Sequence, residues 1–255
     1  MKEKEMGLVV ATNRLTEDIY AMEVRCKAAM TALPGQFCNL YMEDGAHLLP
    51  RPISICKINR TDSTLTFVYR VVGEGTKSFT KLAPNDSIAL MGPLGNGFTD
   101  LDYTKPVLVG GGVGIPPMLG LCQALDGKCT VVLGYRNADT FLLEEFEKTG
   151  ASVVIATDDG SLGTHGTVVD AMKEAGLSYD VIYSCGPKPM LRALKETAAG
   201  AKATCYVSME ERMACGVGAC LGCVCETKDV DDHSKVHNTR ICKDGPVFLA
   251  EEVVL

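Results

Sequence analysis

The sequence of 255 residues predicts a mixed α/β and β protein with three units in succession. These are an antiparallel β-barrel at residues 1–100, a doubly wound parallel α/β domain at 101–205, and a small cysteine-rich domain at 206–255. Three observations support this division. Short alternating apolar runs fill the first hundred residues, apolar and helical segments then take turns, and a dense group of cysteines follows. The first pattern is typical of antiparallel strands and the second of parallel β-α units.

The first unit consists of short apolar runs separated by turn residues. We expect strands at residues 7–12, 19–24, 36–42, 65–72 and 87–93. This spacing is typical of an antiparallel barrel or sandwich. The stretch "GPLGNG" at residues 92–97 is rich in chain breakers and is expected to close the unit.

The second unit alternates strands and helices. We expect strands at 106–110, 129–136, 151–160 and 179–187, and helices at 116–125, 141–150, 166–176 and 188–200. Strict alternation favours a parallel sheet with helices on its faces. Ligands of such sheets bind at the carboxyl ends of the strands.

Composition excludes several classes of protein. The net charge is −7 and the cations are scattered, so no basic stripe is available to hold a nucleic acid. The first ten residues lack the apolar core of a signal peptide, and the long apolar run at 107–122 is too short and too broken to span a bilayer. We therefore expect a cytoplasmic protein without a membrane or nucleic-acid partner. In that compartment clustered cysteines indicate metal binding or redox chemistry rather than disulfides.

The cysteine cluster has the spacing of an iron–sulfur site. Cys215, Cys220 and Cys223 follow C-x4-C-x2-C, and Cys242 is available as a distant fourth ligand, which is the plant-type [2Fe-2S] arrangement. The glycines between them allow a tight loop with backbone N–H groups turned to the sulfurs. A zinc site is the alternative, although structural zinc usually takes two C-x2-C pairs. Cys225 lies one residue past Cys223 in an expected strand, so it should point away from the cluster.

A glycine-rich loop, "VLVGGGVGIPPM" at residues 107–118, joins the first parallel strand to its helix. Helix N-terminal amides and missing side chains at Gly111, Gly112 and Gly114 would suit a pyrophosphate. Pro117 replaces the third glycine of G-x-G-x-x-G, and a plain tight turn explains the glycines equally well on their own. Position at the first β-α turn of a doubly wound sheet favours the anion site.

Three further segments carry candidate site residues. Cys185 ends a strand in "YSCGPKPM", where with Gly186 and Pro187 it could line a nicotinamide pocket as the candidate catalytic residue, or be a buried cysteine before a turn. In "RPIS", Arg51 could clamp a phosphate and Ser54 could bond a ring nitrogen. In "GEGT", Gly75 and Thr76 could begin a helix that binds an anion. An ordinary strand and turn would have the same residue types.

Nicotinamide exchanges electrons in pairs as hydride, whereas a [2Fe-2S] cluster accepts one. A flavin does both. A chain with both sites should therefore hold a flavin between them, and the barrel is the domain left to bind it.

The motifs "RPIS", "GEGT", "GGGVGIPPM" and "CGPKPM" resemble the ferredoxin-NADP reductase superfamily over residues 7–200. With "ERMACGVGACLGC" and "CKDGPVF", the whole chain resembles the electron-transfer subunits of class 1B dihydroorotate dehydrogenases. The resemblance implies NAD as acceptor and a [2Fe-2S] cluster on Cys215, Cys220, Cys223 and Cys242. It also implies FAD on Arg51, Pro52, Ile53, Ser54, Val68, Tyr69, Arg70, Gly75 and Thr76. Many members of the superfamily have an aromatic residue where this chain has Ile53.

The same resemblance implies an FMN-containing partner subunit that oxidises dihydroorotate in pyrimidine (UMP) biosynthesis. Electrons would reach NAD through the cluster and FAD, in a heterotetramer with two copies of each subunit. One alternative is the flavin subunit of a bifurcating or sulfur-linked NAD(P)H:ferredoxin oxidoreductase. Those relatives tend to replace one cluster cysteine with an acidic residue, which this chain does not do. Another is a redox-sensing or zinc-stabilised binding module without turnover. Arg136 could meet the 2′-phosphate of NADP.

Overall fold

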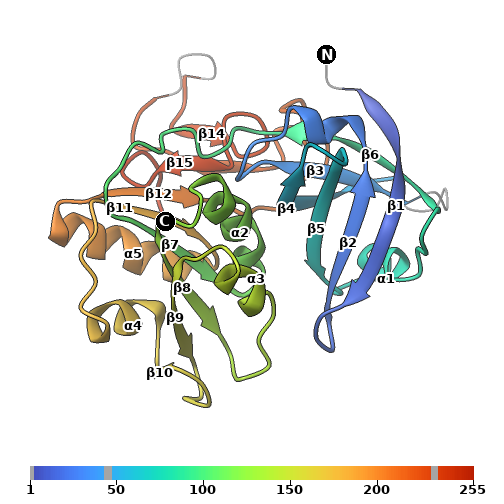
Figure 1. Ribbon diagram of the computed structural model, residues 1–255. Coiled ribbons are helices and arrows are strands. Elements are labelled where there is room, and N and C mark those ends of the chain that lie inside the picture. Colours follow the sequence, from blue (N-terminus) through green and yellow to red (C-terminus); the bar gives the residue numbers. More distant parts are fainter. Residues whose placement is uncertain (1–2, 43–47, 231–234) are drawn as a thin grey trace.

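The computed structural model describes residues 3–42, 48–230 and 235–255. Its N-terminal part is a six-stranded antiparallel barrel, closed in the order β1-β2-β5-β4-β3-β6 (Figure 1). The strands are β1 (Lys4–Arg14), β2 (Ile19–Arg25), β3 (Phe37–Tyr41), β4 (Arg51–Asn59), β5 (Thr64–Arg70) and β6 (Ser87–Leu94). A 3-10 turn, η1 (Lys27–Met30), and a short helix, α1 (Glu74–Phe79), lie in its connections.

Each expected apolar run in this part lies in a strand, because alternate residues face the barrel core. Leu40, Phe67 and Leu90 are among its fully buried side chains. The sequence did not indicate β4 as a sixth strand with the same clarity. Proline lacks the N–H that a strand donates, and Pro52 is the second residue of β4.

The second part is a seven-stranded sheet in the order β10-β9-β8-β7-β11-β12-β15, parallel except for β15. Its strands are β7 (Pro106–Gly111), β8 (Thr130–Tyr135), β9 (Ser152–Thr157), β10 (Thr164–His165), β11 (Val181–Cys185), β12 (Thr204–Ser208) and β15 (Val247–Leu249). The helices are α2 (Ile115–Ala124), preceded by the 3-10 turn η2 (Gly112–Gly114), and α3 (Leu143–Glu147), α4 (Val168–Glu174) and α5 (Lys188–Ala201). Strand order reverses between β7 and β11, which is where ligands bind such sheets.

The helices cover both faces of the sheet. Figure 1 shows α2 and α3 on the side of the barrel, and α4 and α5 on the other side. Helix α2 packs against β4, and a Cβ at Gly120 would lie 2.7 Å from the carbonyl oxygen of Cys56. Lys57 on β4 also forms an ion pair with Glu145 on α3, with Nζ and Oε2 2.5 Å apart. The barrel and the sheet are therefore held together by close backbone packing and a charge pair.

The cysteine-rich tail is joined to the sheet by strand pairing and by a shared apolar core. It contains the small antiparallel pair β13 (Val224–Glu226) and β14 (Asn238–Arg240), and it returns β15 to the sheet beside β12. Ile241 and Val253 lie in the same apolar core as Val207 of the sheet. Asn96, after the barrel, donates to the carbonyls of Asp244 and Val247. The boundary placed at 205 falls within β12, and the three-unit division stays a prediction.

Within the part of the chain that the structure describes, no helix is long and apolar enough to cross a membrane.

Candidate cofactor cleft and cysteine cluster

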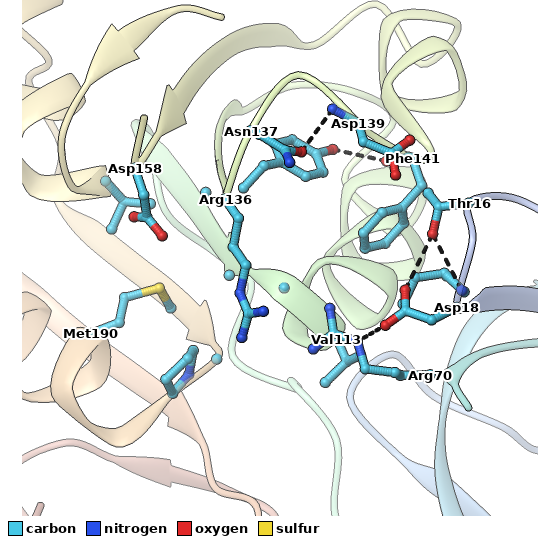
Figure 2. Close-up of a pocket in the computed structure, with 18 of the residues that line it drawn as sticks. Thr16, Asp18, Arg70, Val113, Arg136, Asn137, Asp139, Phe141, Asp158 and Met190 are labelled. Carbon is cyan, nitrogen blue, oxygen red and sulfur yellow. Dashed lines mark hydrogen bonds and ion pairs between the residues drawn. The ribbon is translucent and has the colours of Figure 1, made fainter. Parts of the chain in front are cut away.

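A cavity of about 1310 Å³ lies between the barrel and the carboxyl edge of the parallel sheet (Figure 2). The barrel contributes the β1–β2 turn, the end of β5 and residues of α1. The sheet contributes the loops that follow β7, β8, β9 and β11. The cavity thus lies at the reversal of strand order, where the fold predicts a ligand.

The glycine-rich loop forms one wall of this cleft through Gly111 and Gly112. A side chain at Gly111 would come 2.7 Å from the sulfur of Met190, and Gly112 has a φ of +54°. Gly114 lies behind the wall, where a Cβ would be 2.1 Å from the carbonyl oxygen of Cys185. The missing side chains at Gly111 and Gly112 leave main chain at the surface of the cleft, which suits the close approach of a pyrophosphate.

Gly186 and Pro187 line the cavity beside this loop, where a Cβ at Gly111 would lie 3.3 Å from Cδ of Pro187, but Cys185 does not line it. Cys185 ends β11, between Gly110 of β7 and Ser208 of β12. Burial raises the pKa of its thiol to about 12, against the effect of a hydrogen bond with Ser208. The thiol is therefore neutral and adjacent to the cleft, and its catalytic role stays a prediction.

Arg51, Gly75 and Thr76 come together at the start of α1. A Cβ at Gly75 would lie 2.3 Å from Nε of Arg51, so the guanidinium rests directly on the helix backbone. The hydroxyl of Thr76 accepts the backbone N–H of Val72 at 3.0 Å and of Gly73 at 3.3 Å. This corner offers a planar cation beside helix-start amides, which suits a phosphate group.

The neighbouring strand β5 carries Val68, Tyr69 and Arg70. Arg70 lines the cleft, and its Nε lies 2.9 Å from Oδ2 of Asp18 (Figure 2). Tyr69 is buried and stacks on Tyr20 with ring centroids 6.4 Å apart. Its hydroxyl has no hydrogen-bond partner within the described residues. An orphaned buried hydroxyl costs about 1–3 kcal/mol, so this site fits an additional polar ligand.

Pro52, Ile53 and Ser54 lie on β4, paired with Asn39, Cys38 and Phe37 of β3 in that order. All three are half-buried, and Ile53 packs on the barrel core. They do not line the cleft, so only Arg70 of the predicted flavin residues does. The predicted FAD residues therefore lie on the adjacent strands β4 and β5 and on α1, and Arg70 is the one that reaches the cleft.

The four cysteines of the predicted cluster lie together as two pairs. The thiol of Cys215 interacts with that of Cys220, and the thiol of Cys242 with that of Cys223. Backbone N–H groups also point at the sulfurs. Cys215 Sγ accepts those of Val217 and Cys220 at 3.4 Å, and Cys242 Sγ accepts that of Gly218 at 3.1 Å. The loop reaches this shape with left-handed φ values at Gly216 and Gly218, of +69° and +82°.

The electrostatics of the two pairs differ. Burial disfavours the Cys215 thiolate, but the N–H groups of Val217 and Cys220 outweigh it and lower the pKa to about 6. Burial and the adjacent Cys223 raise the pKa of Cys242 to about 12. Cys220 is exposed, whereas Cys223 and Cys242 are buried.

This donor set fits two irons. A [2Fe-2S] cluster takes two ligands on each of its two irons, and the thiols interact as two pairs, Cys215 with Cys220 and Cys242 with Cys223. Cys225, on β13, is buried in the core, and burial raises its pKa to about 11.

Several residues of the site had no clear signal in the sequence. Asp18, Asp158 and Glu210 line the cleft, and each is one of two adjacent acids in a loop. Asn39 contacts the cysteine loop, since its Nδ2 donates to the carbonyl oxygen of Cys215 at 3.1 Å. In the sequence Asn39 is one of two amide side chains in the apolar run at 36–42, and nothing there distinguishes it from Gln36. Arg136, the residue that could meet a 2′-phosphate, also lines the cleft (Figure 2).

Comparison with known proteins first defines the class. A family model described as "Oxidoreductase NAD-binding domain" matches residues 108–196. A structure titled "Insights into flavin-based electron bifurcation via the NADH-dependent reduced ferredoxin-NADP oxidoreductase structure" is 27% identical, with a TM-score of 0.86. The match covers 98% of this chain and 90% of that chain. A ferredoxin reductase of carbazole 1,9a-dioxygenase shares the fold, with 24% identity, a TM-score of 0.68, and coverage of 79% and 67%. The chain is an oxidoreductase of the ferredoxin-reductase fold.

Further matches identify the family of the chain within this class of fold. A model described as "Iron-sulfur cluster binding domain of dihydroorotate dehydrogenase B" matches residues 210–254. Curated relatives named "Dihydroorotate dehydrogenase B (NAD(+)), electron transfer subunit" are 44% identical in Listeria welshimeri and 40% identical in Caldanaerobacter subterraneus. Each match covers 100% of both chains. The chain belongs to this family of electron transfer subunits.

The predicted fold class, family and oxidoreductase class are thereby confirmed. The expected cofactor set of FAD, a [2Fe-2S] cluster and NAD agrees with the same matches. The residues assigned to each cofactor stay predictions.

Proposed function

We propose that this chain carries electrons from a dihydroorotate-oxidising, FMN-containing partner subunit to NAD in pyrimidine biosynthesis. The observation that carries the proposal is the arrangement of the two sites on the barrel. The cysteine pairs lie against β3 through Asn39, and the cleft opens at the ends of β5 and the β1–β2 turn. The barrel therefore stands between a site for one-electron chemistry and a site for hydride.

When bound, the [2Fe-2S] cluster supplies one-electron transfer and FAD converts it to two-electron hydride chemistry. Arg51 and the first turn of α1 would hold the diphosphate of FAD, with Ser54 near its ring. Gly111 and Gly112 would take the pyrophosphate of NAD, with Gly186 and Pro187 beside the nicotinamide. Cys185 would support this wall as an uncharged side chain, because its pKa is raised.

The exposed side of the cysteine loop would receive the partner subunit. Val217 and Leu221 are 43% and 62% exposed beside the exposed Cys220. Apolar side chains grouped on a surface favour a protein contact. A partner seated there would shorten the path for an electron, and two copies of each subunit would form the heterotetramer.

NAD is proposed over NADP because acids accompany Arg136 in the cleft. Asp139 and Asp158 line the same region (Figure 2). Carboxylates disfavour a 2′-phosphate and can hydrogen-bond a free 2′-hydroxyl. A cytoplasmic location is also proposed, since all twelve cysteines are free, which suits a reducing compartment.

The deciding experiment is co-expression with the adjacent dihydroorotate-oxidising subunit, followed by measurement of NAD reduction driven by dihydroorotate. The proposal predicts reduction that needs both chains, and an absorption spectrum with flavin bands and a cluster shoulder. Ferredoxin-dependent turnover without dihydroorotate activity would instead favour the bifurcating type of enzyme, to which the 27% identical structure belongs. A colourless protein with bound zinc would favour a binding module.

A further inference from the structure

Asn39 occupies an unusual position in the barrel. Its neighbours Cys38 and Leu40 belong to the barrel core, so alternation along β3 turns Asn39 to the outer face. The side chain is nevertheless fully buried, with 0% exposure, because the cysteine loop covers it. Pro52 lies directly opposite on β4. Residues paired in this way share a face of the sheet, so Asn39 stands between the predicted flavin strand and the cluster loop.

The contact with the loop is specific to an amide. Nδ2 of Asn39 donates to the carbonyl oxygen of Cys215, and this carbonyl can only accept. The next residue, Gly216, lies flat on the same amide, where a Cβ would be 2.4 Å from Nδ2. Asn39 thus fixes the peptide that follows a cluster ligand.

Stability of the barrel does not account for an asparagine at this place. The other half of the amide, Oδ1, is buried and has no hydrogen-bond partner in the described part of the chain. A buried, unpartnered oxygen is unfavourable, and a leucine of similar volume would avoid it. The donor to Cys215 is therefore the property that the position requires.

We propose that Asn39 is a positioning residue that sets the properties of the iron–sulfur site by holding the Cys215–Gly216 peptide. This inference rests on the proposed function, since it assumes that Cys215 is an iron ligand. The peptide orientation determines how the N–H groups of Val217 and Cys220 meet the sulfur of Cys215. Hydrogen bonds to cluster sulfurs stabilise the reduced form, so losing their alignment lowers the reduction potential.

The test compares the purified full chain with Asn39→Leu and Asn39→Asp. Aspartate keeps the shape but its carboxylate cannot donate to Cys215, so the pair separates donation from packing. Gln36→Leu is the matched control. Gln36 is a buried amide just before β3; its Nε2 donates to the carbonyl oxygen of Gly95 and its Oε1 accepts the backbone N–H of Leu33, both outside the cysteine loop. The readouts are FAD and iron content, the electron paramagnetic resonance spectrum of the reduced protein, and the cluster potential in a mediated titration.

We expect both Asn39 variants to retain FAD and to be reduced by NADH at the flavin within about twofold of the native rate. The one-electron equilibrium of the cluster should shift at least about tenfold toward the oxidised form. This shift corresponds to a fall of about 59 mV in the reduction potential of the cluster. Loss of iron with FAD retained would be the stronger form of the same effect. The inference would be overturned if both Asn39 variants had the electron paramagnetic resonance spectrum and the cluster potential of the native protein. An equal shift of the cluster potential in Gln36→Leu would overturn it as well. Absence of iron or flavin from the native chain would instead overturn the proposed function.

Discussion

The contact between Gly75 and Arg51 gives a prediction that separates cofactor binding from folding. Gly75 lies inside α1 and its φ is not left-handed, so alanine suits its backbone and favours a helix. The nearest obstacle is Arg51, whose Nε, Cζ and Nη2 would lie 2.3, 2.8 and 3.0 Å from the new Cβ. These atoms are the mobile end of a long side chain, so Gly75→Ala should displace the guanidinium and leave the fold intact.

The magnitude follows from what the guanidinium does for a phosphate. Hydrogen bonds to a charged group contribute about 1.5–3 kcal/mol, and each 1.4 kcal/mol is a factor of ten. Gly75→Ala should therefore weaken FAD binding by about 10- to 150-fold. The midpoint of urea unfolding for the flavin-free protein should be unchanged or slightly higher.

The assay is a titration of flavin-free protein with FAD, followed by quenching of flavin fluorescence. Gly73→Ala is the control, since a Cβ there meets nothing within 4 Å and the residue is in an extended conformation. Arg51→Lys should resemble Gly75→Ala, because it keeps the charge but lacks the planar fork. Native FAD affinity in Gly75→Ala would refute the assignment of Arg51 to the phosphate.

Three further predictions concern other parts of the molecule. Cys220→Ser should remove the cluster signal while NADH still bleaches the flavin, as electron paramagnetic resonance and stopped-flow absorbance would show; a native cluster signal would count against this ligand. Lys57→Met should cost no more than about 1 kcal/mol in urea unfolding, because the ion pair is partly exposed. Lys57 and Lys148 hold the pKa of Glu145 below its ordinary value in the folded protein. The loss of stability in Lys57→Met should therefore be complete at a pH above the ordinary pKa of a glutamate, and it should disappear as the pH falls through the lowered pKa of Glu145. Cys185 is only half-buried, but its pKa is raised to about 12, so it should react with iodoacetamide at about pH 8 far more slowly than glutathione, and rapid labelling would contradict the raised pKa.

The predictable parts of the fold are those with a repeating physical pattern. Alternation of apolar residues indicated the barrel strands, and alternation of strands with helices indicated the doubly wound sheet. The spacing of Cys215, Cys220 and Cys223 indicated the cluster, because a tight loop brings such residues together without help from the rest of the chain. The distant Cys242 completes the two thiol pairs in the structure.

The features that sequence reasoning missed depend on residues far apart in the chain. Strand β15 has only three residues, and it pairs with β12 after an excursion of about forty residues through the cysteine loop. No local pattern reports such a return. Asn39 and Asp18 likewise acquire their roles from partners on other segments. A single polar residue in a strand or a turn has the same appearance whether or not such a partner exists.

The cysteine-rich tail contributes β15 to the sheet beside β12, and Asn96, just after the barrel, is hydrogen-bonded to Val247 of the tail. These two attachments limit how far the tail can move. A swinging arm would have to break backbone pairing and an apolar core at every cycle. The iron–sulfur segment is therefore held in a fixed position relative to the barrel and the sheet. Any donor must come to it, and fusing this tail to an unrelated reductase would require transplanting its two anchorages as well.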